Sequence, residues 1–181
     1  MKFGMDGTTR NSIIDNILNK HKADLGNDFE QYRNHVYRVY NFAIPYVGSD
    51  RDIETLSIAV AFHDLGIWTN RTFDYLEPSI DLAKAYSADH HLPVETIADL
   101  ETIITNHHKL TRIKTSALAE IFRQADLVDL TLGIIRCGRM KKDIVLIRKA
   151  FPNKGFHRNL LWLFLRNLLK NPLRPLPMYK F

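Results

Sequence analysis

Apolar residues in this chain recur at the spacing of one face of an α-helix, and this periodicity is the feature that most restricts the fold. Residues 12–21 carry apolar side chains at that spacing, and so do the segments that follow Asp28, Asp50, Pro78, Pro93 and Ser116. Residues 141–151 and 156–170 are helical in pattern too, whereas no alternating run between turn residues indicates a strand. The sequence therefore predicts an all-α fold, a bundle of helices.

Polar and turn residues indicate where the helices begin and end. Asp28, Asp50 or Asp52, and Thr115 or Ser116 are typical residues for a helix N-terminus, and Pro78 and Pro93 suit a first helical turn. Gly48 and Gly66 are expected to end the second and third helices. After Gly66 we expect a loop of about ten residues before the helix at 77–90.

Length and composition favour one globular domain. The chain has 181 residues, of which 45% are hydrophobic and 25% charged, and it contains no repeat or Gly/Ser-rich linker. Its one cysteine, Cys137, excludes an intramolecular disulfide and a Cys-based zinc cluster. The N-terminus lacks an apolar signal core, and no stretch of about 18 apolar residues is present, so we expect a cytoplasmic protein without a transmembrane segment.

Charge is distributed unevenly along the chain. Residues 1–131 contain 13 Lys/Arg and 19 Asp/Glu, whereas residues 132–181 contain 12 Lys/Arg and only one acid, Asp143. A basic tail of this kind attracts nucleic acid, anionic lipid or anionic substrates, and the charge alone does not choose among them.

Four sites that could bind a metal fall on separate predicted helices, each on or beside an apolar stripe. They are His35, the pair His63-Asp64, His107 or His108, and Asp126. A single histidine on an apolar face usually only packs, but buried carboxylates are rare unless they are paired or bind a metal. Imidazole and carboxylate donors suit Mn, Fe, Co, Ni, Zn or, less well, Mg. Two histidines and two aspartates would leave positions open on a six-coordinate ion, as a catalytic metal requires.

The same residues carry a resemblance to a known family. His35, then His63-Asp64 inside Ala-Val-Ala-Phe-His-Asp-Leu-Gly-Ile, then Asp126 in Arg-Gln-Ala-Asp-Leu, resemble the H…HD…D pattern of HD-domain metal-dependent phosphohydrolases. The resemblance runs from about residue 28 to 132. It implies a helical bundle of the HD-domain type that holds one divalent metal ion through His35, His63, Asp64 and Asp126 and hydrolyses phosphate esters, often of nucleotides. Asp64 is also placed to orient the attacking water.

Two departures from the family pattern guide the choice of further catalytic residues. Ile67 stands where some members that act on deoxynucleotides have a glutamate, so Glu77 is a candidate general acid or water-orienting base, although an acid there also suits the first turn of a helix. His107-His108 is similar to the extra histidines of HD-GYP phosphodiesterases and di-iron oxygenases, but no Gly-Tyr-Pro follows and residues 77–85 contain no histidine. We therefore favour one metal over two, with His107 as an acid, a phosphate donor or an occasional second-metal ligand; simple packing is the alternative.

Substrate-binding candidates lie in the loops beside these motifs. Arg71, His108, Lys109 and Arg112 could bind phosphate, and the planar fork of arginine suits two phosphate oxygens at once. In the alternative interpretation, Arg71, Lys109 and Arg112 are ordinary surface residues. Residues 156–170 are apolar with basic interruptions, which favours a helix that covers the bundle or contacts a second copy of the chain in a homodimer over one that binds anionic lipid.

These observations predict one domain over residues 1–181, with a metal-binding core at about 28–132 and a basic, apolar, helical C-terminal extension at about 139–181. The predicted function is a metal-dependent phosphohydrolase in which a metal-activated water cleaves a small phosphorylated substrate, the nucleotide class being favoured by the resemblance. The alternatives are an iron-dependent oxygenase or lyase on the same scaffold, and a non-catalytic module that binds nucleic acid or another partner through its basic tail.

Overall fold

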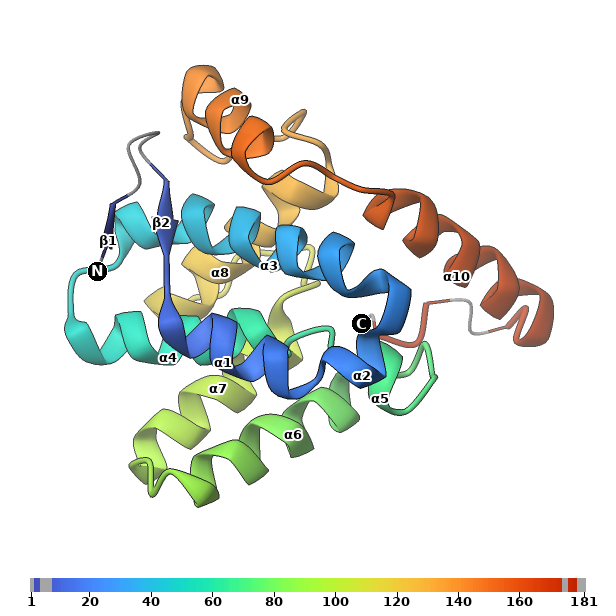
Figure 1. The fold of residues 1–181 in the computed structure, drawn as a ribbon, viewed down its shortest axis with the longest axis horizontal. Helices are drawn as coiled ribbons and strands as arrows, with labels where there is room; N and C mark the ends of the chain where they lie inside the picture. Colours follow the sequence, from blue (N-terminus) through green and yellow to red (C-terminus); the bar gives the residue numbers. More distant parts are fainter. Residues whose placement is uncertain (1, 4–7, 174–175, 179–181) are drawn as a thin grey trace.

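A computed structural model describes residues 2–3, 8–173 and 176–178, and over these residues the chain forms an all-α bundle (Figure 1). The helices are α1 (Ser12–Lys20), α2 (Lys22–Leu25), α3 (Phe29–Ala43), α4 (Asp50–Phe62), α5 (Gly66–Thr69), α6 (Leu76–Asp89), α7 (Val94–Asn106), α8 (Ala117–Leu130), α9 (Lys141–Ala150) and α10 (Phe156–Lys170). Short 3-10 turns lie at Gly26–Asp28 and Ile44–Tyr46. The predicted C-terminal extension is described only up to Lys170 of α10, residues 171–173 and residues 176–178; its other residues lie outside the described part.

One short strand pair was not predicted. Lys2–Phe3 (β1) pairs antiparallel with Thr9–Arg10 (β2). Strands of two residues are too short to give an alternating pattern, so the periodicity could not indicate them. None of the helices in the described residues is long and apolar enough to cross a membrane.

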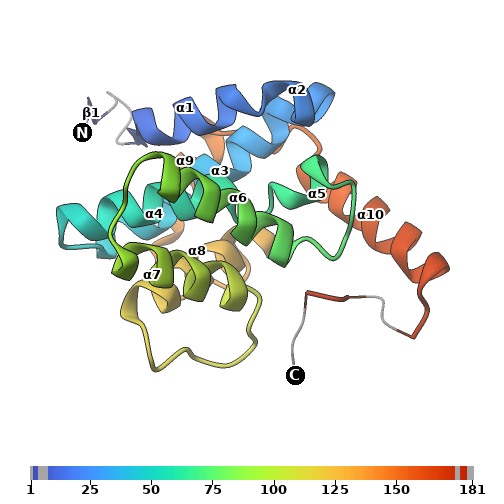
Figure 2. The same ribbon diagram turned by 90° about the horizontal axis from the view of Figure 1, so that it is seen from below.

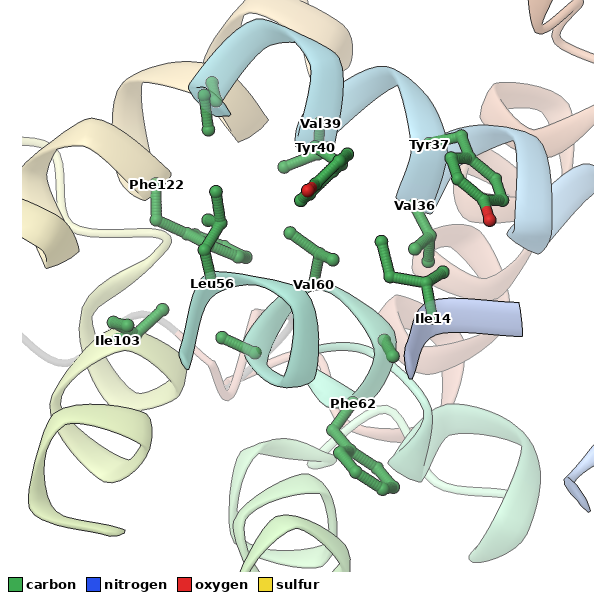
Figure 3. Packing of buried hydrophobic residues seen from close by; sticks show 14 of the residues in the cluster. Ile14, Val36, Tyr37, Val39, Tyr40, Leu56, Val60, Phe62, Ile103 and Phe122 are labelled. Atoms are coloured by element: carbon green, nitrogen blue, oxygen red, sulfur yellow. The ribbon is translucent and has the colours of Figure 1, made fainter. Parts of the chain in front are cut away.

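The core lies where α3 crosses α4 and α8. Figure 3 shows Val36 and Tyr40 of α3 facing Leu56 and Val60 of α4, with Phe122 of α8 beside them, and all five side chains are completely buried. Burial of each such side chain stabilises the fold by roughly 1.5–3 kcal/mol. The helix pair α6 and α7 closes the lower side of the bundle in Figure 1, and α7 also packs against α4 and α8.

Helix ends agree with the sequence in some places and differ in others. Ser116 caps α8 as predicted, because its side chain accepts a hydrogen bond from the Ala119 backbone N–H at 3.2 Å. Ser49, not Asp50 or Asp52, caps α4, because it has extended backbone angles that let its hydroxyl accept from the Asp52 N–H at 3.0 Å. Asp28 stands before α3 without capping it.

Asp28 instead joins distant helices. Its carboxylate accepts hydrogen bonds from Trp68 Nε1 at 2.9 Å and from Asn159 Nδ2 at 3.1 Å. These contacts tie α5 and α10 to the start of α3. The other oxygen of this carboxylate accepts from the side chain of Gln31, and Asp28 has helical backbone angles instead of the extended ones of an N-cap.

Glu120 on α8 holds the loop that joins α7 to α8. Its carboxylate accepts from the Ile113 backbone N–H at 2.9 Å and from two nitrogens of Arg123 at 2.7 and 2.9 Å. Arg123 also donates to the carbonyl of Lys109 at 3.2 Å. The hydrogen bonds from Arg123 are the main cause that lowers the pKa of Glu120, from an ordinary 4.5 to about 2.

Replacing this carboxylate tests its contribution to the fold. Because the pKa of Glu120 is lower in the folded chain, its stabilising effect is present above about pH 4.5 and is lost as the pH falls towards 2. We expect Glu120→Gln to lower the free energy of unfolding at pH 7 by roughly 1–3 kcal/mol. Urea denaturation at pH 7, 4 and 3 should show the difference from the wild-type protein shrinking with acid.

Glu95→Gln is the matched control, because Glu95 is exposed in the first turn of α7. Its effect should stay within about 0.5 kcal/mol. A Glu120→Gln protein as stable as the wild type at pH 7 would contradict the role assigned to this carboxylate.

Candidate metal centre

Four helices bring the predicted ligands into one buried cluster. His35 lies in α3, His63 and Asp64 lie in the turn directly after α4, His107 directly follows α7, and Asp126 lies in α8. Their exposed fractions are 1%, 0%, 4%, 2% and 3% in that order. We call these five residues the His/Asp cluster.

The turn that carries His63 and Asp64 depends on a close contact at Gly66. α4 ends at Phe62, so Gly66 does not end it as predicted but begins α5. The Gly66 N–H donates to Ser79 Oγ at 3.0 Å, and a Cβ atom on residue 66 would lie 2.6 Å from the carbonyl oxygen of Tyr75. Glycine is therefore required because α6 approaches the turn too closely for any side chain.

Hydrogen bonds orient two of the histidines. His63 Nδ1 lies 2.9 Å from the carbonyl oxygen of Val60, and His107 Nδ1 lies 2.7 Å from that of Ile104. A carbonyl oxygen only accepts, so Nδ1 must donate in both rings. The Nε2 atoms of the neutral rings therefore direct their lone pairs at the cluster, as in metal-binding histidines.

His35 is oriented by a carboxylate that the sequence analysis did not single out. Its Nδ1 donates to Asp129 Oδ2 at 2.7 Å. Arg38 donates to the same carboxylate from Nε at 2.6 Å and from Nη2 at 2.9 Å. Burial acts to raise the pKa of Asp129, but the hydrogen bonds and charges of His35 and Arg38 outweigh it and hold that pKa well below its ordinary value. Asp129 is therefore an ionised acceptor.

The ligand atoms crowd together. His35 Nε2 lies 3.0 Å from His63 Nε2, and Asp64 Oδ2 lies 3.2 Å from His63 Nε2 and 3.6 Å from His35 Nε2. Asp126 Oδ1 lies 3.7 Å from His35 Nε2. Two neutral imidazoles cannot hydrogen-bond through facing lone pairs, so a proton or a metal ion must lie between them.

The electrostatics of the cluster also fit a cation. Over the described part of the chain, no Lys or Arg nitrogen lies within 4 Å of the carboxylate of Asp64 or Asp126. Asp64 Oδ1 and His107 Nε2 are buried without a hydrogen-bond partner, 3.4 Å apart. Burial lowers the pKa of His35, but hydrogen bonds to Asp129 and Asp64 outweigh it and raise the pKa to about 9. The cluster thus attracts positive charge, and its donors are those that divalent transition metals prefer.

Three overlapping sets of side chains could hold an ion. They are His35, His63 and Asp126; His63, Asp64 and His107; and His107, His108 and Asp126. Within each set the donor atoms lie within 4.8 Å of one another. The buried cluster could therefore bind metal, and the three sets leave both the identity and the number of ions open.

The other predicted site residues divide into two groups. His107 and His108 lie at the cluster; His108 Nδ1 is 3.9 Å from Asp126 Oδ2, and its Nε2 is 2.5 Å from the hydroxyl of Tyr75. Arg71, Glu77, Lys109 and Arg112 are exposed, and none of them lines the cavity beside the cluster. The structure does not bring these four to the cluster, and their catalytic and phosphate-binding roles stay predictions.

A cavity of about 290 Å³ adjoins the cluster and was not anticipated from the sequence. His35, Asp64, Asp126, His108 and Tyr75 form one side of it. Residues of α10 also line it, and Figure 2 shows this helix running away from the bundle. The cluster is therefore open to a small molecule.

No protein-family model, curated protein or solved structure matches this chain.

Metal binding gives the most direct test of the cluster. A divalent ion supplied at 100 times its dissociation constant should raise the free energy of unfolding by about 2.7 kcal/mol. His63→Ala should remove that gain, because His63 belongs to two of the three donor sets. Thermal denaturation and titration calorimetry with Mn, Fe, Co, Ni, Zn and Mg would measure it.

The matched variant is His90→Ala, because His90 is exposed at the end of α6. It should bind metal as the wild type does. The assignment is wrong if no ion distinguishes the wild-type protein from His63→Ala.

Gly66 can be tested with a glycine elsewhere as reference. Gly66→Ala places a methyl group 2.6 Å from the Tyr75 carbonyl oxygen and 2.9 Å from Ser79 Oγ, whereas a Cβ at Gly48 meets nothing within 4 Å. We expect Gly66→Ala to lower the free energy of unfolding by roughly 1–3 kcal/mol. Gly48→Ala should leave the free energy of unfolding nearly unchanged in the same urea titration. If the two variants lower it equally, a close contact at Gly66 is not the cause.

Proposed function

We propose that this protein is a metal-dependent phosphohydrolase that cleaves a phosphate ester of a small substrate. The observation that carries the proposal is that the His/Asp cluster, deficient in positive charge, forms part of the wall of a cavity. A purely structural metal site is closed by protein ligands, whereas a catalytic one adjoins space for water and substrate. The resemblance of His35, His63-Asp64 and Asp126 to the HD-domain pattern supports the same reaction class.

The residues of the His/Asp cluster have different roles in the proposed reaction. A bound divalent ion would supply an activated water and stabilise charge on a phosphoryl oxygen. Asp64 is suited to orient the water, because one of its oxygens lies among the histidines and Oδ1 has no hydrogen-bond partner. His35 is held in place by Asp129, and His63 and His107 by backbone carbonyls, so the cluster is preorganised.

Tyr75 and His108 provide polar groups on the cavity side. Their hydrogen bond of 2.5 Å lies next to Asp126. Burial is the main cause that lowers the pKa of His108 well below its ordinary value, so its ring is neutral. In the proposed reaction this pair hydrogen-bonds the phosphate group or the leaving oxygen, the role predicted from the sequence for His108 but not for Tyr75.

A second candidate is an iron-dependent oxygenase or lyase. The set His107, His108 and Asp126 favours it, because it offers ligands for a second ion next to the first. The cavity is also lined by no Lys or Arg in the described residues, although a phosphate group often binds such side chains. Iron content and oxygen uptake distinguish this candidate from hydrolysis.

The test is release of phosphate by metal-free protein resupplied separately with Mn, Fe, Co, Ni, Zn or Mg. An aryl phosphate should be hydrolysed with at least one of these ions and not without metal. Asp64→Asn should lower kcat by about 100-fold or more, because the attacking water would lose the group that orients it.

Asp81→Asn is the control, since Asp81 is exposed on α6. It should keep wild-type activity, and circular dichroism should show the same helix content in both variants. Stoichiometric metal binding without phosphate release on any ester would overturn the phosphohydrolase proposal and favour the second candidate.

A further inference from the structure

Most of the cavity lining outside the His/Asp cluster is apolar. The apolar residues are Phe73, Leu130 of α8, Phe156, Leu160, Leu161 and Phe164 of α10, Leu176 and Met178. Phe156 and Met178 are buried, whereas Leu161 is 57% and Leu176 39% exposed, so the apolar lining is deep beside the cluster and opens to solvent elsewhere. Among the described residues the only polar side chains on the cavity surface are Tyr75, His157 and members of the cluster with His108.

Such walls favour an apolar group and disfavour a nucleoside. A base and a ribose carry several hydrogen-bonding groups, and each one buried without a partner costs roughly 1–3 kcal/mol. An apolar group of the same size gains free energy on entering, because it leaves water without losing hydrogen bonds.

The size of the cavity sets a limit on that group. Its volume of about 290 Å³ is close to twice that of a protein cavity of about 150 Å³ that binds benzene. A medium-length alkyl chain or a substituted aromatic ring fills this space, and any further length of chain would lie in solvent at the open side of the cavity.

The apolar wall is continuous with the cluster. The ring of Phe156 stacks on His35, with centroids 4.0 Å apart and an interplanar angle of 13°. His157 Nε2 lies 2.9 Å from the carbonyl oxygen of Asp129, which fixes the first turn of α10 beside the cluster. Phe164 lies eight residues after Phe156 in α10, which is about 12 Å along the helix axis at 1.5 Å per residue. A molecule in the cavity therefore has one end at the cluster and the other between apolar side chains.

We propose that this cavity binds the apolar part of the substrate, so that the protein acts on phosphate esters of apolar alcohols of medium length. The inference rests on the proposed function, because it places the phosphate group at the divalent ion that the His/Asp cluster would hold. The oxygen of the water bonds to phosphorus as the bond from phosphorus to the alcohol oxygen breaks. The proton that the water loses ends on the alcohol oxygen, so the products are the alcohol and inorganic phosphate. Nucleoside monophosphates are poor substrates in this proposal.

A series of alkyl phosphates tests the proposal. With the best metal, kcat/KM should rise from methyl to butyl to hexyl phosphate, by about fourfold for each methylene group that becomes buried. It should level off at a length that fills the cavity. Nucleoside monophosphates should be hydrolysed no faster than methyl phosphate. Equal rates along the series, or a preference for a nucleotide, would overturn the inference while leaving the phosphohydrolase assignment in place.

Two neighbouring residues on α10 give a matched pair of variants. Phe164 lines the cavity, whereas Leu165 is 47% exposed and does not line it. Phe164→Ser should lower kcat/KM for octyl phosphate by about tenfold, within the range seen when apolar contacts in a pocket are lost, and should lower that for methyl phosphate much less. Leu165→Ser should change neither. If both variants behave alike, Phe164 does not form the binding wall.

A binding measurement separates failure of the cavity from failure of the reaction. Titration calorimetry of metal-loaded protein should show octylphosphonate, which is not hydrolysed, binding at least about tenfold more tightly than methylphosphonate. Tight binding by a protein that releases no phosphate from any ester would overturn the proposed function and support the apolar site. Equal affinity for the two phosphonates would overturn the apolar site regardless of turnover.

Discussion

The carboxylate of Asp129 joins more parts of this molecule than any hydrophobic contact described above. It receives two hydrogen bonds from Arg38 and one from His35, and the Asp129 carbonyl oxygen contacts His157 at the start of α10. Arg38 also donates to the carbonyl oxygen of Phe151 at 3.0 Å, directly after α9. Removing one partner of a buried ion pair costs about 3–5 kcal/mol. The packing of α3, α8 and the C-terminal helices therefore depends on the same few hydrogen bonds that orient His35.

Unlike the hydrogen bonds of Asp129, the His/Asp cluster destabilises the folded chain. Two buried carboxylates face three histidines, without a lysine or arginine nitrogen within 4 Å in the described part of the chain. Burial acts to raise the pKa of both carboxylates. The pKa of Asp126 is raised as a result, whereas at Asp64 the interactions with His63, His107 and His35 outweigh burial and lower the pKa. Such an arrangement weakens folding locally and is typical of functional sites, where neighbouring packing and hydrogen bonds hold it in place.

The sequence predicted the helices well because long amphipathic segments carry their own periodic signal. It also pointed to the residues of the cluster, since His35, the pair His63-Asp64, His107 and Asp126 occur on or beside apolar stripes of separate predicted helices. Asp129 and Arg38 could have been found, because each lies three residues from a cluster residue on the same helical face. Tyr75 and His157 give no local signal, and the short helix α5 and the cavity depend on contacts between segments far apart in the chain. Exposure of Arg71, Glu77, Lys109 and Arg112 likewise follows from tertiary packing that no local pattern encodes.

The two sides of the cavity come from different parts of the chain. Helices α3, α7 and α8 and the turn after α4 supply the cluster, whereas α10 and Met178, near the end of the sequence, supply much of the apolar wall. α10 contacts the bundle mainly through its first turns, and its outer face leaves Trp162 54% and Leu169 86% exposed. Substitutions in α10 beyond Phe156 and His157, which contact His35 and Asp129, can therefore change the shape of the cavity with little effect on the cluster. During evolution, the residues of the cluster could stay the same while the set of molecules that fit the cavity changed.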